Sequence, residues 1–265
     1  MQNKLKESVQ IESFNKDTLK TLNLYNDQNG YNNAAGILAD QNDFPGIDIV
    51  KFGDSISIIK KRATFDNMSI LKAYDKSIDI FRDYYQYEVI EGADRKKVEK
   101  IPEAAFREAI ANALIHRVWD VESQIRVLLF DDKIEIVSPG GLPAGITEDE
   151  YLDGKISVLR NRNLANVFYR LGFVEIFGTG IKRIKQLYEE GPQKPDFEVT
   201  ENTIKIILPI FEKNANLTED ERKIYEILSK TMLKSIREIA PYVPFGKSKT
   251  TQLLKEMKKK RYCSY

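Results

Sequence analysis

Residues 101–117 read Ile-Pro-Glu-Ala-Ala-Phe-Arg-Glu-Ala-Ile-Ala-Asn-Ala-Leu-Ile-His-Arg, and the fold prediction starts from this stretch. Pro102 suits the first turn of a helix, where its missing N–H costs nothing. Alanines and straight-chain residues continue the helix. Glu108, Asn112 and His116 are spaced four apart, and side chains at i and i+4 are neighbours on a helix surface. The stretch therefore predicts a helix with one polar stripe.

The stripe has two interpretations. Asn112 offers a neutral oxygen to Mg²⁺, which prefers oxygen ligands and keeps several waters, while Glu108 can orient or deprotonate a water. Alternatively, the helix is amphipathic and half exposed, and the polar side chains at its edge are simply hydrogen-bonded. The pattern alone favours this second interpretation. His116, the one histidine of the chain, either contacts a phosphate or caps the stripe in a structural role. A structural role is the commoner case for a histidine.

Downstream, a hairpin and two glycine-rich turns follow. Residues 124–137 alternate or are rich in β-branched residues on both sides of Asp131-Asp-Lys, which predicts a β-hairpin. The hairpin leads into Ser138-Pro-Gly-Gly, and a later Phe177-Gly-Thr-Gly opens another helix. Glycines before a helix let backbone N–H groups approach an anion. Each turn alone is a weak signal, and neither is a Rossmann or Walker A motif.

In order and spacing, these motifs together resemble the GHKL-type ATP-binding domain. They are most similar to its divergent, HATPase-like branch in bacterial and archaeal transcriptional regulators, often labelled RecG-like C-terminal. The resemblance covers about residues 100–212. The motifs that carry it are Glu108-x-x-x-Asn112, Ser138-Pro-Gly-Gly-Leu-Pro, Ser157-x-x-Arg160-Asn161 and Glu175-x-x-Gly-Thr-Gly.

The resemblance implies an α+β fold with a GHKL-like α/β sandwich, with ATP and Mg²⁺ as cofactors. By the same resemblance Glu108 positions the catalytic water, and Asn112 binds the metal. The other expected nucleotide-binding residues are His116, Ser138, Gly140, Gly141, Arg160, Gly178, Thr179 and Gly180, of which the last three would cradle phosphate. Ser138 departs from the family, where an aspartate reads the adenine amino group, so that hydrogen bond would lack charge assistance.

Composition bounds the class of protein. The 265 residues favour two domains or one large one. A net charge of +1 hides a charge of +7 on residues 213–265 and −6 on the rest, which suggests an anionic partner for the C-terminal part. The single cysteine, Cys263, argues against an internal disulfide framework and fits a reducing cytosol. No apolar run reaches membrane-spanning length, so a cytoplasmic protein without membrane contact is expected.

Residues 1–95 are expected to form an N-terminal α/β region, before a GHKL-like domain at residues 96–212. The expected elements are helices around residues 17–24, 31–38 and 69–87, strands at 47–52 and 55–59, an exposed hairpin loop at 92–97, a mobile loop at 146–154 and a last sheet strand ending at Pro209. This N-terminal region is similar to the segment that follows a Schlafen AlbA-like domain in the same regulators. The upstream domain itself is not in the sequence, so a short version or remnant of a three-part regulator is expected.

Residues 217–265 are expected to form a helix-turn-helix module. Thr218-Glu-Asp-Glu and Ser235-Ile-Arg-Glu fit capping boxes, Pro244-Phe-Gly makes a turn, and a basic helix follows at 247–260. This order is that of a winged helix-turn-helix with a truncated or absent wing. Ser248, Lys249, Thr250 and Gln252 are predicted to face a DNA groove. Lys258, Lys259, Lys260 and Arg261 are predicted to contact phosphates.

Three functions remain open from the sequence. The first, which the charge difference and Ser138 favour, is a DNA-binding transcriptional regulator whose divergent nucleotide-binding domain senses a ligand or dimerises. The second is a Mg²⁺-dependent ATP hydrolase of GHKL type, recruited to DNA or to a protein. The third is a C-terminal module that docks protein, because a charge run is often only a solvated face. Whether the chain is an enzyme, and whether it forms a homodimer, stay open.

Overall fold

The computed structural model describes residues 15–91, 94–154, 158–175, 178–189, 191, 193–210, 218–230 and 236–259. The chain divides into two compact units. Residues 1–187 and 195–210 form the first, and residues 188–194 and 211–265 form the second.

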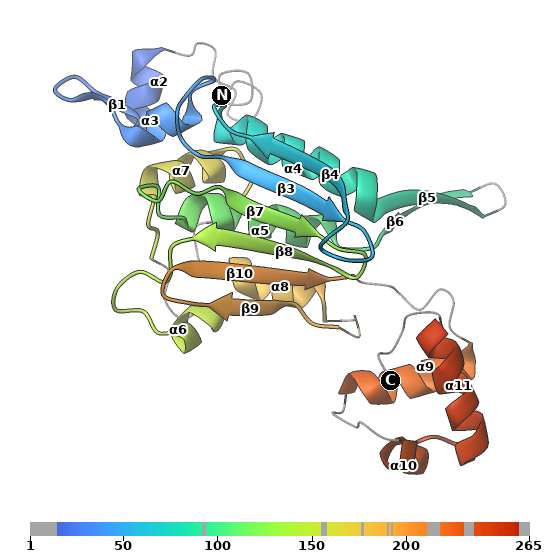
Figure 1. The fold of residues 1–265 in the computed structure, drawn as a ribbon. Helices are drawn as coiled ribbons and strands as arrows, with labels where there is room; N and C mark the ends of the chain where they lie inside the picture. The colour runs from blue at the N-terminus through green and yellow to red at the C-terminus, as the bar shows by residue number, and fades with distance from the viewer. Residues whose placement is uncertain are drawn as a thin grey trace. The chain divides into compact units, whose positions relative to one another are not determined.

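A six-stranded mixed sheet forms the centre of the first unit (Figure 1). All neighbouring strands are antiparallel except β3 and β7, which are parallel. The mixed sheet and its helices confirm the α+β class. In sheet order the strands are β4 (Ile59–Phe65), β3 (Ile47–Phe52), β7 (Ile125–Leu129), β8 (Lys133–Pro139), β10 (Thr203–Pro209) and β9 (Asp196–Val199).

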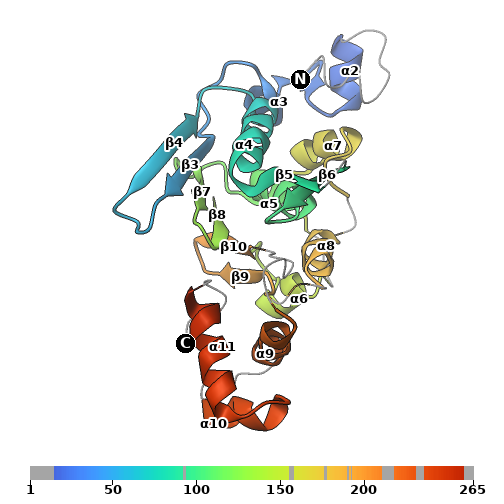
Figure 2. The same ribbon diagram turned by 90° about the vertical axis from the view of Figure 1, so that its right-hand side faces the viewer.

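Helices cover one side of this sheet (Figure 2). They are α4 (Ile70–Tyr85), α5 (Glu103–His116), α7 (Arg162–Arg170) and α8 (Gly180–Leu187). Every second residue of the central strands is buried, for example Val127, Ile136 and Ile206, which pair across β7, β8 and β10. Helix α5 is buried along most of its length, and its alanines let neighbouring elements approach closely. The predicted helix at 101–117 and the predicted hairpin are both confirmed.

Four local features differ from the expectations. The strand expected at 55–59 begins only at Ile59, because residues 55–58 turn and Ile58 N donates to Ser55 O at 3.0 Å. Residues 94–97 of the expected loop at 92–97 are strand, in a hairpin of β5 (Gln86–Glu91) and β6 (Asp94–Glu99), and residues 92–93 lie outside the described residues. The expected loop at 146–154 contains α6 (Glu148–Leu152), which Thr147 caps. Strand β9 was not expected.

The sheet also crosses the expected boundary at residues 95/96. Ile47 of β3 pairs with Ile125 of β7, so the N-terminal residues supply two strands of the central sheet. Before them come α2 (Lys16–Thr21), β1 (Tyr25–Asn26), β2 (Gly30–Tyr31) and α3 (Asn33–Leu38). In the described ranges, no helix combines the length and apolar character that crossing a bilayer requires.

The second unit contains α9 (Glu219–Lys230), α10 (Ile236–Ile239), a 3₁₀ turn η1 (Ala240–Tyr242) and α11 (Lys247–Lys259). The predicted capping box at the start of α9 is confirmed, since Thr218 N donates to Glu221 Oε2 at 2.7 Å and Glu221 N donates to Thr218 Oγ1 at 3.3 Å. Ser235 lies outside the described residues. The core of the unit is made by Ile224, Tyr225, Ile239, Val243, Leu253, Leu254 and Met257.

Candidate functional site

The polar stripe on α5 is assembled as the four-residue spacing predicts. Asn112 Nδ2 donates to Glu108 Oε1 at 3.3 Å. Glu108 is only 5% exposed, and Arg183 of α8 approaches it, with Nη1 at 3.5 Å from Glu108 Oε2. Burial raises the pKa of the Glu108 carboxyl, while the Arg183 cation and the Asn112 amide oppose that rise. A carboxyl with a raised pKa is suited to proton transfer near neutral pH.

Helix α8 begins directly against this pair. A Cβ on Gly180 would lie 2.5 Å from Glu108 Oε1 and 2.7 Å from Asn112 Nδ2, so any larger residue would force the ends of these two side chains to shift. Gly178, two residues earlier, has φ +66°, in the left-handed region where glycine is favoured. The helix N-terminus is thereby held next to a carboxylate and an amide, and unpaired N–H groups there favour anions.

A small cavity of about 50 Å³ lies beside the pair. Six predicted nucleotide-binding residues line it: Asn112, His116, Gly141, Arg160, Gly178 and Gly180. Glu108, Ser138, Gly140 and Thr179 are not among its lining residues. Residues that the sequence did not single out also line it: Pro143, Ile146, Tyr151, Gly154, Val158, Ile181 and Ile204.

His116 is neutral at physiological pH. Burial lowers its pKa to about 4, and the nearby Arg160 cation acts in the same direction. A neutral imidazole can donate one hydrogen bond to a phosphate, but it brings no positive charge. Its contribution to an anion site is therefore small.

Ser138, Arg160 and Asn161 are all engaged at the C-terminus of α5. Ser138 Oγ donates to Ala113 O at 3.0 Å, Arg160 Nη1 donates to His116 O at 2.7 Å, and Asn161 Nδ2 donates to Ile115 O at 2.7 Å. The last carbonyls of a helix lack partners within the helix. In this conformation the Ser-Pro-Gly-Gly and Arg-Asn motifs therefore cap α5.

The two glycines after Ser138 permit close packing. Gly140 has φ +101°, and its N–H donates to Asn202 O at 2.7 Å. A Cβ on Gly141 would overlap the carbonyl oxygens of Thr200 and Glu201. The approach of the turn between β9 and β10 thus explains Gly141. Gly140 is explained by its positive φ and by Val118, whose Cγ2 an added Cβ would overlap.

The residues present fit one end of a nucleotide. With Nδ2 turned to Glu108, the Oδ1 of Asn112 is left for a metal ion or its water, and a single protein ligand suffices for Mg²⁺ when phosphates and waters supply the rest. Within the described residues, no group of three or more His, Cys, Asp or Glu side chains could hold a metal alone. The cavity is too small for the base and sugar, since ligand pockets are typically about 300–1,000 Å³.

The predicted DNA-contacting residues lie on α11, with one correction. Ser248, Lys249 and Gln252 are exposed, but Thr250 is fully buried and its hydroxyl donates to Gly246 O at 3.1 Å. Thr250 therefore lies inside the unit and not on the exposed face. Lys258 and Lys259 are in the last turn of α11, and Lys260 and Arg261 lie outside the described residues.

Two of the exposed groups already have partners. Lys249 Nζ lies 2.5 Å from Asp220 Oδ2 of α9, and Gln252 Nε2 donates to Glu256 Oε1 at 3.0 Å. The Lys249 cation lowers the pKa of Asp220. A DNA phosphate or base would have to exchange with these contacts.

Comparison with known proteins matches part of the chain. Residues 122–208 match the family model described as "Putative ATP-dependent DNA helicase recG C-terminal". This range contains both glycine-rich turns but not α5, so Glu108 and Asn112 lie outside it. No curated protein matches.

A crystal structure of the DIP2311 protein from Corynebacterium diphtheriae has a similar fold, with a TM-score of 0.71 and 22% identity. The match covers 96% of this chain and 56% of that one, so this chain spans about half the length of its structural relative. The sheet, its helices and the matched range together show that an ATPase-like domain is present in this chain.

Proposed function

We propose that the first unit binds an adenine nucleotide with Mg²⁺ between α5, the Gly140–Gly141 turn and α8. The observation that carries this proposal is the packing of Gly180 against Glu108 and Asn112. It brings a helix N-terminus, a carboxylate and an amide oxygen to one point, at the edge of an ATPase-like domain.

Each side chain then has a defined task. Asn112 Oδ1 holds the metal ion, which supplies positive charge to the phosphates, and the N–H groups at the start of α8 bind phosphate oxygens. Glu108 accepts a proton from an attacking water, if hydrolysis occurs, because its buried carboxyl has a raised pKa. The nearby Arg183 cation favours the ionised form of that carboxyl, which is the form that can act as a base.

Calorimetric titration of the full chain with ATP, with and without Mg²⁺, tests the proposal. We expect weak, Mg²⁺-dependent binding that Asn112→Ala abolishes. Glu108→Gln should keep binding but remove any phosphate release. The matched control is Asn166→Ala, a partly buried asparagine of α7 that does not line the cavity. Absence of heat with ATP, ADP and GTP at millimolar concentration would contradict the proposal.

For the second unit we propose DNA binding, which would make the protein a nucleotide-responsive transcriptional regulator. The specific observation is the exposed polar face of α11, formed by Lys247, Ser248, Lys249, Gln252 and Lys255, in a region of charge +7. α10, the turn and α11 follow one another as in a helix-turn-helix, in which the second helix enters the major groove.

Mobility-shift titrations of the full chain at several salt concentrations test DNA binding. Each phosphate contact should add about −0.9 to the slope of log affinity against log salt. Gln252→Ala should alter sequence preference, whereas Lys255→Gln should weaken binding equally for all sequences. If the chain binds no DNA at low salt, the second unit docks a protein instead, and the nucleotide proposal is unaffected.

A further inference from the structure

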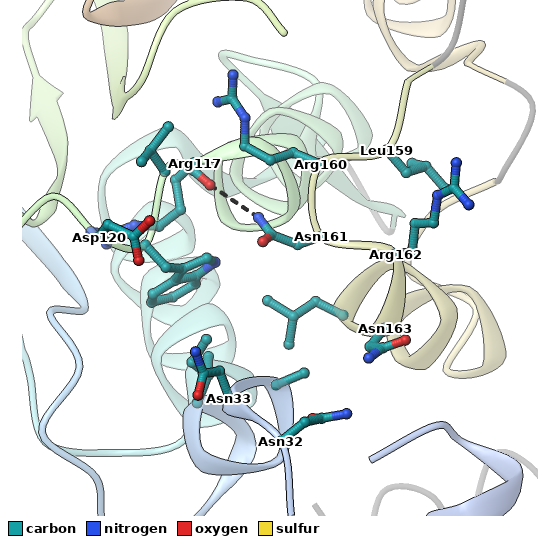
Figure 3. Close-up of a pocket in the computed structure, with 14 residues that line it drawn as sticks. Asn32, Asn33, Arg117, Asp120, Leu159, Arg160, Asn161, Arg162 and Asn163 are labelled. Carbon is teal, nitrogen blue, oxygen red and sulfur yellow. Dashed lines mark hydrogen bonds between the residues drawn. The ribbon is translucent and has the colours of Figure 1, made fainter. Parts of the chain in front are cut away.

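A second cavity lies next to the nucleotide site, and Arg160 lines both. It has a volume of about 670 Å³, within the range of small-molecule sites. It lies in the first unit, between the start of α3, the loop after α5 and the start of α7 (Figure 3).

Some hydrogen-bond donors at this cavity have no partner among the described residues. Trp119 lines it, and its buried Nε1 has no hydrogen-bond partner. The first turn of α7 receives no side-chain cap, because the N-cap residue Asn161 donates its amide to Ile115 O and Arg117 O instead. Buried donors left unpaired are costly, so an acceptor in the cavity would stabilise this arrangement.

Arginines also place positive charge in the lining. The Arg117 guanidinium lies over the Trp119 ring, 4.3 Å from its centroid, and the Asp66 carboxylate offsets part of the fall in the Arg117 pKa that burial causes. Arg117 lines the cavity and is fully buried; three carbonyl oxygens receive its Nη groups, and its Nε has no partner. In the described part of the chain, no carboxylate lies within ion-pair distance of it. Arg162, an exposed lining residue at the start of α7, likewise makes no ion pair with the described residues. Asp120 is the one carboxylate in the lining.

Amide groups complete the lining. Asn33 faces the cavity from α3, and Asn163 lines it from α7. An asparagine amide both donates and accepts, so it suits hydroxyl groups, which do the same. A ligand that matches this lining carries a negative charge, several acceptor oxygens and hydroxyls.

We propose that this cavity binds a sugar phosphate, either free or as part of a nucleotide. The phosphate lies at the uncapped N-terminus of α7 beside Arg162, because helix N-termini and arginine both favour phosphate. The sugar hydroxyls contact Asn33 and Asn163. Binding needs no metal ion and does not involve Asn112.

Trp119, the only tryptophan of the chain, reports on this cavity directly. We would follow its fluorescence, and the heat of binding, as the full chain is titrated with ribose 5-phosphate, AMP and inorganic phosphate in the absence of Mg²⁺. Saturable binding of ribose 5-phosphate or AMP is expected. Preference for one of the two tells whether the free sugar phosphate or the nucleotide is the ligand.

Two variants and two controls locate the binding. Arg162→Gln or Asn163→Ala should weaken it about tenfold, since each removes a hydrogen bond to a charged or polar ligand. Arg170→Gln, an exposed arginine at the other end of α7, should leave it unchanged, and so should Asn112→Ala.

The proposal is overturned if neither ester saturates, if inorganic phosphate binds as tightly as both esters, or if both cavity variants bind like the wild type. It is also overturned if Asn112→Ala abolishes the binding, because the ligand would then occupy the nucleotide site.

Discussion

Arg160 donates a hydrogen bond from Nη1 to the main-chain carbonyl oxygen of His116, at 2.7 Å. The same guanidinium donates from Nη2 to Gly141 O at 2.8 Å. One side chain thereby joins the end of α5, the turn after β8 and the segment that enters α7. Arg160 also lines both cavities. A ligand that moves this side chain in one cavity would therefore change the lining of the other.

Replacing Arg160 by glutamine should destabilise the first unit. Two carbonyl oxygens would lose a charged donor, at a cost of about 1.5–3 kcal/mol. Urea unfolding followed by circular dichroism measures the loss. Arg162→Gln, two residues away and without a described partner, should change stability by no more than about 0.5 kcal/mol. Equal losses in the two variants would show that the contacts of Arg160 do not stabilise the fold.

His116 should make the protein less stable in acid. Its pKa in the folded state is about 4, below the ordinary value of about 6.5, so the unfolded chain binds more protons between these values. Stability is full above pH 6.5 and falls as the pH drops towards 4, by about 1–3 kcal/mol.

His116→Gln removes this dependence. Thermal unfolding between pH 7 and pH 4 should show that the wild type loses more stability in acid than the variant does. The comparison isolates His116 from Glu108, whose raised pKa acts in the opposite direction in both proteins. Parallel curves would contradict the prediction.

Gly180→Ala should separate binding from stability. The new Cβ would overlap the ends of the Glu108 and Asn112 side chains, which can move aside but would then lose their mutual hydrogen bond. Because alanine also favours the helix by up to about 1 kcal/mol, we expect little net change in melting temperature and a loss of Mg²⁺-dependent ATP binding. Gly246→Ala, where the added Cβ meets open space, is the control and should retain binding.

Asp220→Asn should strengthen DNA binding by the second unit. Lys249 would be released from its 2.5 Å ion pair, and one negative charge would leave the neighbourhood of α11. Mobility shifts at low salt should show a several-fold gain and a steeper salt dependence. Glu219→Gln removes the same charge one residue earlier, where the partner is Lys223 at 3.6 Å, and should give a smaller gain. A gain of the same size would mean that only net charge matters.

Local patterns predicted those parts of the molecule that depend on neighbours in the chain. The stripe of Glu108 and Asn112, the hairpin of β7 and β8 and the capping box at Thr218 follow from short spacings. The burial of Thr250 could also have been found, because it lies three, four and seven residues before Leu253, Leu254 and Met257 on the same helix face.

Contacts between residues far apart in the sequence could not be predicted from local patterns. The parallel pairing of β3 with β7 has no local signature, since nothing in the sequence of either strand specifies its partner. Arg183 reaches Glu108 from a helix far along the sequence. The capping of α5 by Ser138, Arg160 and Asn161 has no local signature either, because each donor lies 25 or more residues after the carbonyl that it reaches.

The pairing of β8 with β10, which sets Pro139 opposite Thr203, has a consequence during synthesis. The β7–β8 hairpin has a short turn and can form as soon as it leaves the ribosome. The free edge of β8 stays unpaired until the chain from Gly140 to Asn202 has been synthesised and β10 can pair with it. Closing this long loop slows completion of the sheet. An unpaired strand edge of this kind is prone to join other chains. Translation speed between β8 and β10 should therefore govern how much newly made protein aggregates.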